Sequence, residues 1–447
     1  MAEHGTCSPQ RTIAALQLTT RILLVALMGA PACASLWSTS PATEATPATS
    51  ISPTQPEDAA TATTTTGHPP GHMRPLGSHA PPEADAPSLA AMPSPTSFFH
   101  EFVSPGRPVL FRGAALRMPA FSRWADDDYL RVRYGSLEVS VELGKKENRS
   151  AGVYSSSLAS FLRSFALEDV YMVESLPVAM RDEVWPPSCL ACGGLQRALV
   201  DSVLWLSGGG TKSVLHYDSL DNIICVLAGR KRFFMADRAE LERLALDHAD
   251  EAFLGVDVDR VDMYRYPGLR RMRWYRATVD AGDCFFIPYK WLHQVNSDAG
   301  RSLAVNFWFV HLHWFNQTDC EKTPQPPAAQ DVPLSDYQMA STLELLRSQV
   351  LEDFEGRDVV TLGEMKDWLR GRGQTNGSGI LARLFQASDR DGDGALTMEE
   401  LYAAPVEMFA SLLGVTGDAK TEDDNVLSPL RQATHPQAQQ TRTSDEL

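Results

Sequence analysis

The chain has 447 residues, a formal net charge of −16 at pH 7 and 43% hydrophobic residues. Its length allows two to three domains, and its hydrophobic content is ordinary for a globular protein. The acidic balance argues against a nucleic-acid-binding protein, which needs a basic surface. It is compatible with a basic peptide as a partner.

The N-terminal residues have the pattern of a targeting signal. Arg11 and Arg21 precede an apolar run over residues 22–30, which is followed by a small-x-small site at residues 32–34. This pattern predicts a secretory signal peptide over residues 1–34. The run is shorter than the about 20 apolar residues that span a bilayer, so we predict no transmembrane helix in the mature chain. An uncleaved anchor and a mitochondrial presequence are the alternatives.

Residues 35–96 are rich in Pro, Thr, Ala and Ser. Such a composition buries too little apolar surface to offset the entropy of ordering, so we predict a disordered linker of the kind that carries O-glycans.

The chain ends in the sequence Ser-Asp-Glu-Leu at residues 444–447. This ending resembles the retrieval signal of the endoplasmic reticulum, with Ser in place of the basic residue. Together with the signal peptide, it predicts a lumenal protein and a retrieval receptor as a partner. Sequons at Asn148, Asn316 and Asn376 add three expected glycosylation sites.

Three residues have the chemistry and spacing of one metal site. His216 and Asp218 are two apart, so on a strand they point to the same face. His293 follows a second apolar strand pattern, 75 residues after Asp218. Two imidazoles and one carboxylate form the facial triad of non-haem Fe(II) oxygenases. We therefore predict His216, Asp218 and His293 as iron ligands and as the catalytic centre.

A lysine lies in the strand pattern that follows. Residues 222–227 read as a strand, Ala228-Gly229 as a tight turn, and residues 231–235 as a second strand. Lys231 could project into the same barrel interior as the predicted metal ligands. A buried lysine needs an anionic partner, and a dicarboxylate co-substrate would supply one.

These segments resemble the JmjC/cupin-like Fe(II)/2-oxoglutarate-dependent oxygenases, and especially their hydroxylase branch. The shared residues are His216, Asp218, Asn222, Lys231, His293 and the run Val305-Asn306-Phe307-Trp308. The resemblance covers residues 97–315 and implies a mainly β double-stranded β-helix of the jelly-roll or cupin type. It also implies that 2-oxoglutarate binds at Lys231, Ser213, Asn222 and Asn306, and that the reaction is hydroxylation of a C–H bond.

The alternation of the last strand separates two further histidines from the predicted iron site. If Asn306 faces the barrel interior, Trp308 and Val310 face the same way. His311 and His313 then lie on the other face, so we do not predict them as metal ligands, despite their spacing.

Five cysteines remain after removal of the signal peptide. Cys189 and Cys192 form an isolated C-x-x-C, which favours a local disulfide in an oxidising compartment over a zinc site. Cys225 and Cys284 lie within strand patterns and are predicted as small core residues.

The C-terminal part predicts a linker over residues 316–334, a small helical EF-hand pair over 335–415 and a disordered tail over 416–447. Residues 389–400 match the 12-residue Ca²⁺ loop at its informative positions. Expected Ca²⁺ ligands are Asp389, Asp391, Asp393, the Ala395 carbonyl and Glu400, with Thr397 acting through water. The loop over 353–364 is degenerate, because an arginine at position 5 has no oxygen to donate.

Taken together, the sequence predicts an Fe(II)- and 2-oxoglutarate-dependent oxygenase in the endoplasmic reticulum lumen, acting on a protein side chain and carrying a Ca²⁺-binding module. The alternative is a non-catalytic lumenal Ca²⁺-binding adaptor with an idle cupin domain. Iron content and 2-oxoglutarate binding distinguish the two.

Overall fold

The computed structural model describes residues 67–146, 152–243, 248–250, 253–322, 332–373 and 378–413. The predicted signal peptide, the first half of the predicted linker, Asn148, Asn376 and the predicted tail with its retrieval-like ending lie outside these residues. Within the described parts of the chain, none of the helices has the length and apolar character needed to cross a membrane.

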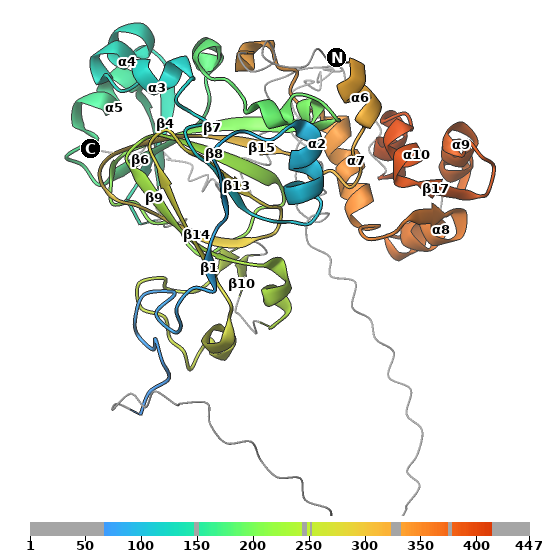
Figure 1. Ribbon diagram of the computed structural model, residues 1–447, viewed down its shortest axis with the longest axis horizontal. Helices are drawn as coiled ribbons and strands as arrows, with labels where there is room; N and C mark the ends of the chain where they lie inside the picture. Colours follow the sequence, from blue (N-terminus) through green and yellow to red (C-terminus); the bar gives the residue numbers. More distant parts are fainter. Residues whose placement is uncertain are drawn as a thin grey trace, which may run out of the picture.

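Two β-sheets form the centre of the molecule in a jelly-roll-like arrangement (Figure 1). The small sheet has the order β1 (Ala84–Asp85), β12 (Tyr275–Asp280), β9 (Arg230–Ala236) and β14 (Leu292–Ser297). The large sheet has the order β2 (Ser88–Leu89), β3 (Val109–Phe111), β13 (Cys284–Ile287), β8 (Asp221–Ala228), β15 (Ala299–Phe309), β7 (Leu199–Gly209), β6 (Val170–Ser175), β4 (Glu138–Leu143) and β5 (Val153–Ser157). A separate hairpin joins β10 (His248–Asp250) and β11 (Phe253–Leu254). The predicted cupin-like β-fold is therefore confirmed.

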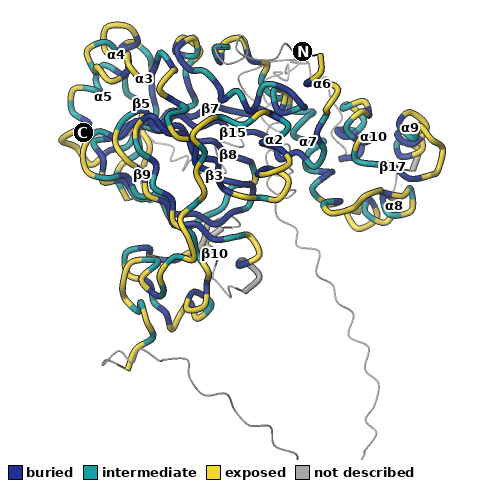
Figure 2. Tube along the Cα trace, in the orientation of Figure 1, coloured by how far each residue is buried: buried dark blue, intermediate teal, exposed yellow. Residues whose placement is uncertain are grey.

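The strands have apolar side chains at alternating positions, and one set fills the space between the sheets. This set includes Ile224 and Val226 of β8, Phe233 and Met235 of β9, and Phe285 of β13. The other face of the large sheet packs on the short helices α2 (Pro95–Phe98), α3 (Pro119–Arg123), α4 (Asp127–Tyr134) and α5 (Leu158–Ser164). The central strands of the large sheet, such as β13 and β8, are consequently almost entirely buried (Figure 2).

The turn between β8 and β9 lies where the sequence predicts it. Gly229 has a φ of +78°, and a Cβ there would lie 2.6 Å from the carbonyl oxygen of Arg301. Glycine adopts this positive φ without strain and, because it has no Cβ, it also avoids the close contact with the Arg301 oxygen. This turn brings β9, which carries Lys231, across to the small sheet.

The predicted disordered linker ends earlier than residue 96. Residues 67–96 pack on the barrel: β1 pairs with β12 and β2 pairs with β3. The indole N–H of Trp274 donates to the Ala80 carbonyl at 2.9 Å, and the His79 ring contacts the Met272 carbonyl. The prediction of disorder was wrong for residues 67–96, because the average composition of a segment contains no information on short stretches that pair with distant strands.

The disulfides join cysteines that are distant in the chain. Cys192 is bonded to Cys320, and Cys225 is bonded to Cys284. Cys189 is a free, buried thiol, so the local Cys189–Cys192 disulfide that the sequence allows is not formed. Cys225 and Cys284 face each other on the paired strands β8 and β13, with their Cα atoms 4.0 Å apart. They lie in the core as predicted, but as a covalent pair.

Part of the predicted 316–334 linker also folds against the domain. Helix α6 (Gln317–Lys322) carries Cys320 and is thus fixed to residue 192, and Leu334 is buried. Asn316 precedes α6 and is half-buried, with its side-chain oxygen accepting from the Asp319 amide. Its glycosylation stays a prediction.

The C-terminal residues form a separate helical module with its own core (Figure 1). Its elements are α7 (Thr342–Glu352), β16 (Val359–Thr361), α8 (Leu362–Gly371), α9 (Ser378–Ser388), β17 (Ala395–Thr397), α10 (Met398–Ala403) and α11 (Glu407–Leu412). Strands β16 and β17 pair antiparallel and join two helix–loop–helix units. Thr361 and Thr397 begin α8 and α10, each with a glutamate three residues later in a capping box.

A candidate metal centre and co-substrate pocket

Two predicted metal ligands lie side by side on paired backbone. The amide of His216 donates to the carbonyl of His293 at 3.0 Å, and the amide of His293 donates back at 2.7 Å. This reciprocal pair links β14 to the segment that leads into β8. The two imidazole rings consequently have centroids 4.2 Å apart. Residues 77 positions apart in the chain are brought together by this local pairing.

Backbone contacts set the tautomer of both rings. The Nδ1 atom of His216 lies 2.9 Å from the Val214 carbonyl, and that of His293 lies 2.9 Å from the Trp291 carbonyl. A carbonyl oxygen only accepts, so each Nδ1 carries the hydrogen and each Nε2 keeps its lone pair. This is the arrangement that prepares histidine for a metal.

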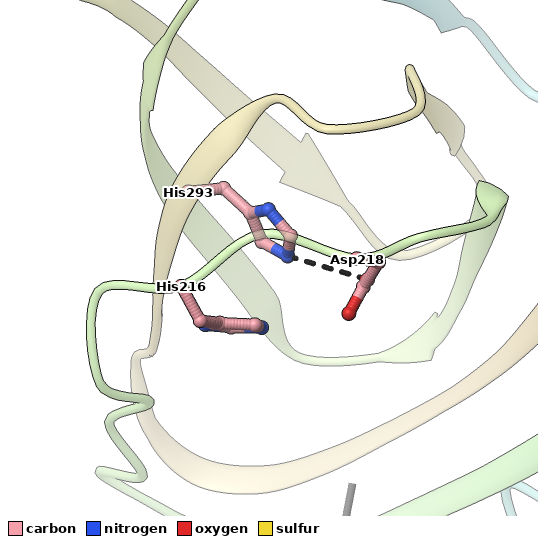
Figure 3. Close-up of side chains that lie close together, drawn as sticks. All are labelled: His216, Asp218 and His293. Carbon is pink, nitrogen blue, oxygen red and sulfur yellow. Dashed lines mark ion pairs between the residues drawn. The ribbon is translucent and has the colours of Figure 1, made fainter. Parts of the chain in front are cut away.

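Asp218 completes the group on the same side (Figure 3). Its carboxylate lies 3.7 Å from Nε2 of His293, and the three ligand atoms lie within 4.8 Å of one another. The backbone of Asp218 is held by the amide of Lys290, which donates to its carbonyl at 2.9 Å. The structure thus brings together the three residues predicted for iron, with two nitrogens and one oxygen.

The triad lies in a pocket between the two sheets. The predicted co-substrate residues Ser213, Asn222, Lys231 and Asn306 line this pocket together with the triad. Strand alternation accounts for the lining: Lys231 and Phe233 of β9 face it, as do His293, Val295 and Ser297 of β14. His311 and His313 are not among its lining residues, and neither is Val310, which was predicted to face the barrel interior with Asn306. The alternation does not continue past Trp308, because the pairing of β15 with β7 shifts register between Trp308 and Phe309.

Lys231 is fully buried, and its position is unusual for a charged group. Its ammonium donates to the hydroxyl of Ser297 at 3.0 Å, and Ser297 in turn accepts from Thr211. Among the described residues no carboxylate is paired with it. Burial lowers the pKa of Lys231 to about 8, because the charged form loses its hydration. An anion in the pocket would restore that lost stabilisation.

Two of the predicted residues contact each other. The side-chain amide of Asn306 donates to the side-chain oxygen of Asn222 at 2.9 Å, which leaves the Asn306 oxygen buried without a partner among the described residues. Ser213 accepts from the amide of Val295 at 2.8 Å. Ser213 therefore supports β14 as well as lining the pocket.

Among the lining residues, Trp205 and Ser297 were not predicted from the sequence, whereas Trp308 was expected to face the barrel interior with Asn306. The indole N–H groups of Trp205 and Trp308 are buried without a partner in the described parts of the chain. Ser297 could have been found from its alternation with His293. Trp205 lies on β7, whose register against β15 is not visible in the sequence.

The predicted Ca²⁺ loop places three carboxylates together. Ligand atoms of Asp389, Asp391 and Asp393 lie within 4.8 Å of one another. Glu400 is buried, and its carboxylate accepts from the amides of Arg390 and Thr397. In the upstream loop, Asp353 instead pairs with an arginine and with the Trp368 indole, which agrees with the predicted degeneracy.

Comparisons with known proteins identify the central domain. Residues 95–313 match the family model described as a cupin-like domain. Jumonji C domain-containing protein 5 of Drosophila melanogaster is 30% identical over 248 residues, which are 51% of this chain and 59% of that protein. Lysine-specific demethylase JMJ30 of Arabidopsis thaliana is 25% identical over 242 residues, or 50% and 53% of the two chains. The human bifunctional peptidase and (3S)-lysyl hydroxylase JMJD7 is 26% identical over 267 residues, or 50% and 83%.

The chain thus spans little more than half the length of the first two of these relatives. The fold and the family match together show a cupin-like domain over residues 95–313, and this domain is similar to the Jumonji C relatives. The relatives' names include both a demethylase and a lysyl hydroxylase, so they do not assign one reaction to this chain.

Proposed function

We propose that this protein is an Fe(II)- and 2-oxoglutarate-dependent oxygenase. The proposal rests on the buried ammonium of Lys231, which lies in the same pocket as the triad of His216, Asp218 and His293 and has no carboxylate partner among the described residues. A buried cation without a carboxylate is costly unless a ligand compensates it. A dicarboxylate bridging metal and ammonium would use both features.

The residues present fit both groups. Two imidazole Nε2 atoms and one carboxylate would hold iron on one side and leave positions open for other ligands. Lys231 would pair with the distal carboxylate of 2-oxoglutarate, and the orphaned oxygen and indole N–H groups of the pocket offer further hydrogen bonds. When bound, iron and 2-oxoglutarate supply the oxidising chemistry. The chain's own residues position both groups and keep the pocket apolar around them.

We infer that the substrate is a protein side chain. Support comes from the human relative whose name includes (3S)-lysyl hydroxylase, which this chain covers over 83% of its length. An acidic chain with a net charge of −16 favours a basic peptide.

We also propose the endoplasmic reticulum lumen as the location. The signal-peptide pattern, the ending at residues 444–447 and the two disulfides support this proposal, since disulfides persist in oxidising compartments. Glycosylation at the sequons would follow from the same location.

The C-terminal module is proposed to bind Ca²⁺ as an EF-hand pair. The β16–β17 pairing, the grouped aspartates of the loop over 389–400 and the buried Glu400 support this assignment. Glu400 also takes part in the capping box of α10, so Ca²⁺ would compete for a carboxylate that accepts from backbone amides.

The decisive experiment measures succinate formed from 2-oxoglutarate by the chain lacking residues 1–34, with Fe(II) and ascorbate. Turnover should vanish in His216→Ala and persist in His100→Ala, which removes an exposed histidine far from the pocket. Binding of 2-oxoglutarate and iron is measured in parallel, because turnover can require the substrate. Absence of both binding events would support the alternative, a Ca²⁺-binding adaptor with an idle cupin domain.

A further inference from the structure

A second group of metal-binding side chains lies where the cupin-like domain meets the helical module. His311 and His313 lie two and four residues after the end of β15, and Glu355 lies three residues after the end of α7. One ligand atom of each lies within 4.8 Å of the other two. None of the three lines the co-substrate pocket. The group is therefore assembled from two domains and is separate from the proposed iron site.

The His311 ring is held by a buried carboxylate. Its Nδ1 atom lies 2.8 Å from Oδ2 of Asp221, whose side chain is fully buried. The other oxygen of Asp221 accepts from the Tyr289 amide at 2.8 Å. A carboxylate accepts, so Nδ1 of His311 carries the hydrogen and Nε2 keeps its lone pair. This carboxylate–histidine arrangement typically supports histidine ligands of zinc.

His313 contributes one ring nitrogen to the same group. The backbone amide of His313 donates to the Tyr402 hydroxyl of the module at 3.0 Å. This contact fixes His313 against α10.

Glu355 is ionised and already has a cationic neighbour. Its Oε1 lies 2.7 Å from the guanidinium of Arg238, and this pairing lowers the pKa of Glu355 against the opposing effect of burial. A carboxylate has two oxygens and can bind a metal while it keeps one hydrogen-bond donor. Lys290 is neutralised separately by Glu352. The surrounding charges therefore do not exclude a divalent cation.

We propose that His311, His313 and Glu355 bind one divalent transition metal of the Zn²⁺ class, which clamps the cupin-like domain to the C-terminal module. Two imidazoles and one carboxylate suit Zn²⁺ and exclude Ca²⁺ and Mg²⁺, which take oxygen ligands. The metal needs residues from both sides, so it binds only when the module is docked. A purely polar contact between the domains is the competing explanation.

The test distinguishes this site from the proposed iron site and from the proposed Ca²⁺ loop. The full chain carries His216→Ala and Asp218→Ala, which remove the proposed iron ligands, and excess Ca²⁺ occupies oxygen-rich loops. Co²⁺ then serves as the probe, because nitrogen ligands give it visible absorption, and equilibrium dialysis gives the stoichiometry. We expect one equivalent of Co²⁺, displaced by Zn²⁺.

Further substitutions in this background assign the ligands. His313→Ala and Glu355→Gln should each abolish the absorption band, whereas Glu344→Gln, a matched control on the preceding helix α7, should retain it. Asp221→Asn should weaken binding by about 10–100-fold, as expected for a residue that supports a histidine ligand. Circular dichroism identifies any variant that fails to fold, and the two ligand substitutions act as independent checks.

Two results would overturn the proposal. One is the absence of a bound equivalent in the triad-deficient protein. The other is a bound equivalent that survives both His313→Ala and Glu355→Gln. Either result would leave the three side chains as a polar contact between domains. Neither depends on oxygenase activity, so the proposed function is tested separately.

Discussion

At the scale of single residues, the charge of Lys231 is the most consequential feature of the pocket. Lys231→Ala should raise the dissociation constant of 2-oxoglutarate by about 100-fold, since removing one partner of a buried ion pair costs about 3 kcal/mol. Calorimetric titration of 2-oxoglutarate measures this effect. Lys212→Ala is the matched control, because Lys212 also lines the pocket but is paired with Asp259. Equal effects of the two substitutions would contradict the role given to Lys231.

Lys231 also predicts that the affinity for 2-oxoglutarate depends on pH. Burial lowers the pKa of Lys231 to about 8, and only the protonated ammonium attracts a carboxylate. Affinity for 2-oxoglutarate should thus be constant below about pH 8 and fall about tenfold per pH unit above it. Lys231→Arg keeps the charge at all these pH values, so its affinity profile should be flat. A wild-type profile that is flat to about pH 10 would argue against this explanation.

The sequence was informative about single residues wherever chemistry and alternation coincide. His216, Asp218, Lys231 and Asn306 were predicted for the site, and the structure places all of them around one pocket. Trp205 was missed, because its contribution depends on the pairing of β7 with β15 across a long separation in the chain.

At the scale of elements, the predictions succeeded for local turns and failed for distant pairing. The Gly229 turn follows from two neighbouring residues. The disulfides depend instead on which strands and loops become neighbours: β8 and β13 are separated by β9 and β12 in the chain, yet they place Cys225 opposite Cys284. Periodicity within a segment contains no information on that placement, so the cysteine pairing could not be derived.

The disulfide between Cys192 and Cys320 predicts a stability effect. It joins positions 128 residues apart and fixes α6 to the domain. The double substitution Cys192→Ala/Cys320→Ala should lower the free energy of unfolding by about 2–5 kcal/mol, chiefly because the unfolded chain gains freedom. Thermal and denaturant unfolding measure this loss. Cys189→Ala removes a buried thiol that is in no disulfide, and a loss as large as that of the double variant would contradict the assignment.

At the scale of the whole molecule, the helical module contacts the chain segment that positions the triad. Lys290 has a φ of +59°, its amide donates to the Asp218 carbonyl at 2.9 Å, and its ammonium lies 2.5 Å from Glu352 of α7. The left-handed backbone at Lys290 is strained for a residue with a side chain, so neighbouring contacts must hold it. Docking of the helical module is therefore linked to the position of Asp218, one of the three residues proposed to bind iron.

This link predicts a selective effect on metal binding. Glu352→Gln removes the ion pair with Lys290, which is partly exposed and contributes about 0.5–1 kcal/mol. Apparent affinity for Fe(II) should fall about two- to fivefold, while affinity for 2-oxoglutarate measured with the metal site saturated should stay near wild type, because Lys231 is untouched. Glu344→Gln is the control, since Glu344 pairs with Arg347 within α7. If Glu352→Gln leaves the Fe(II) dependence unchanged, the module is docked beside the triad without supporting it.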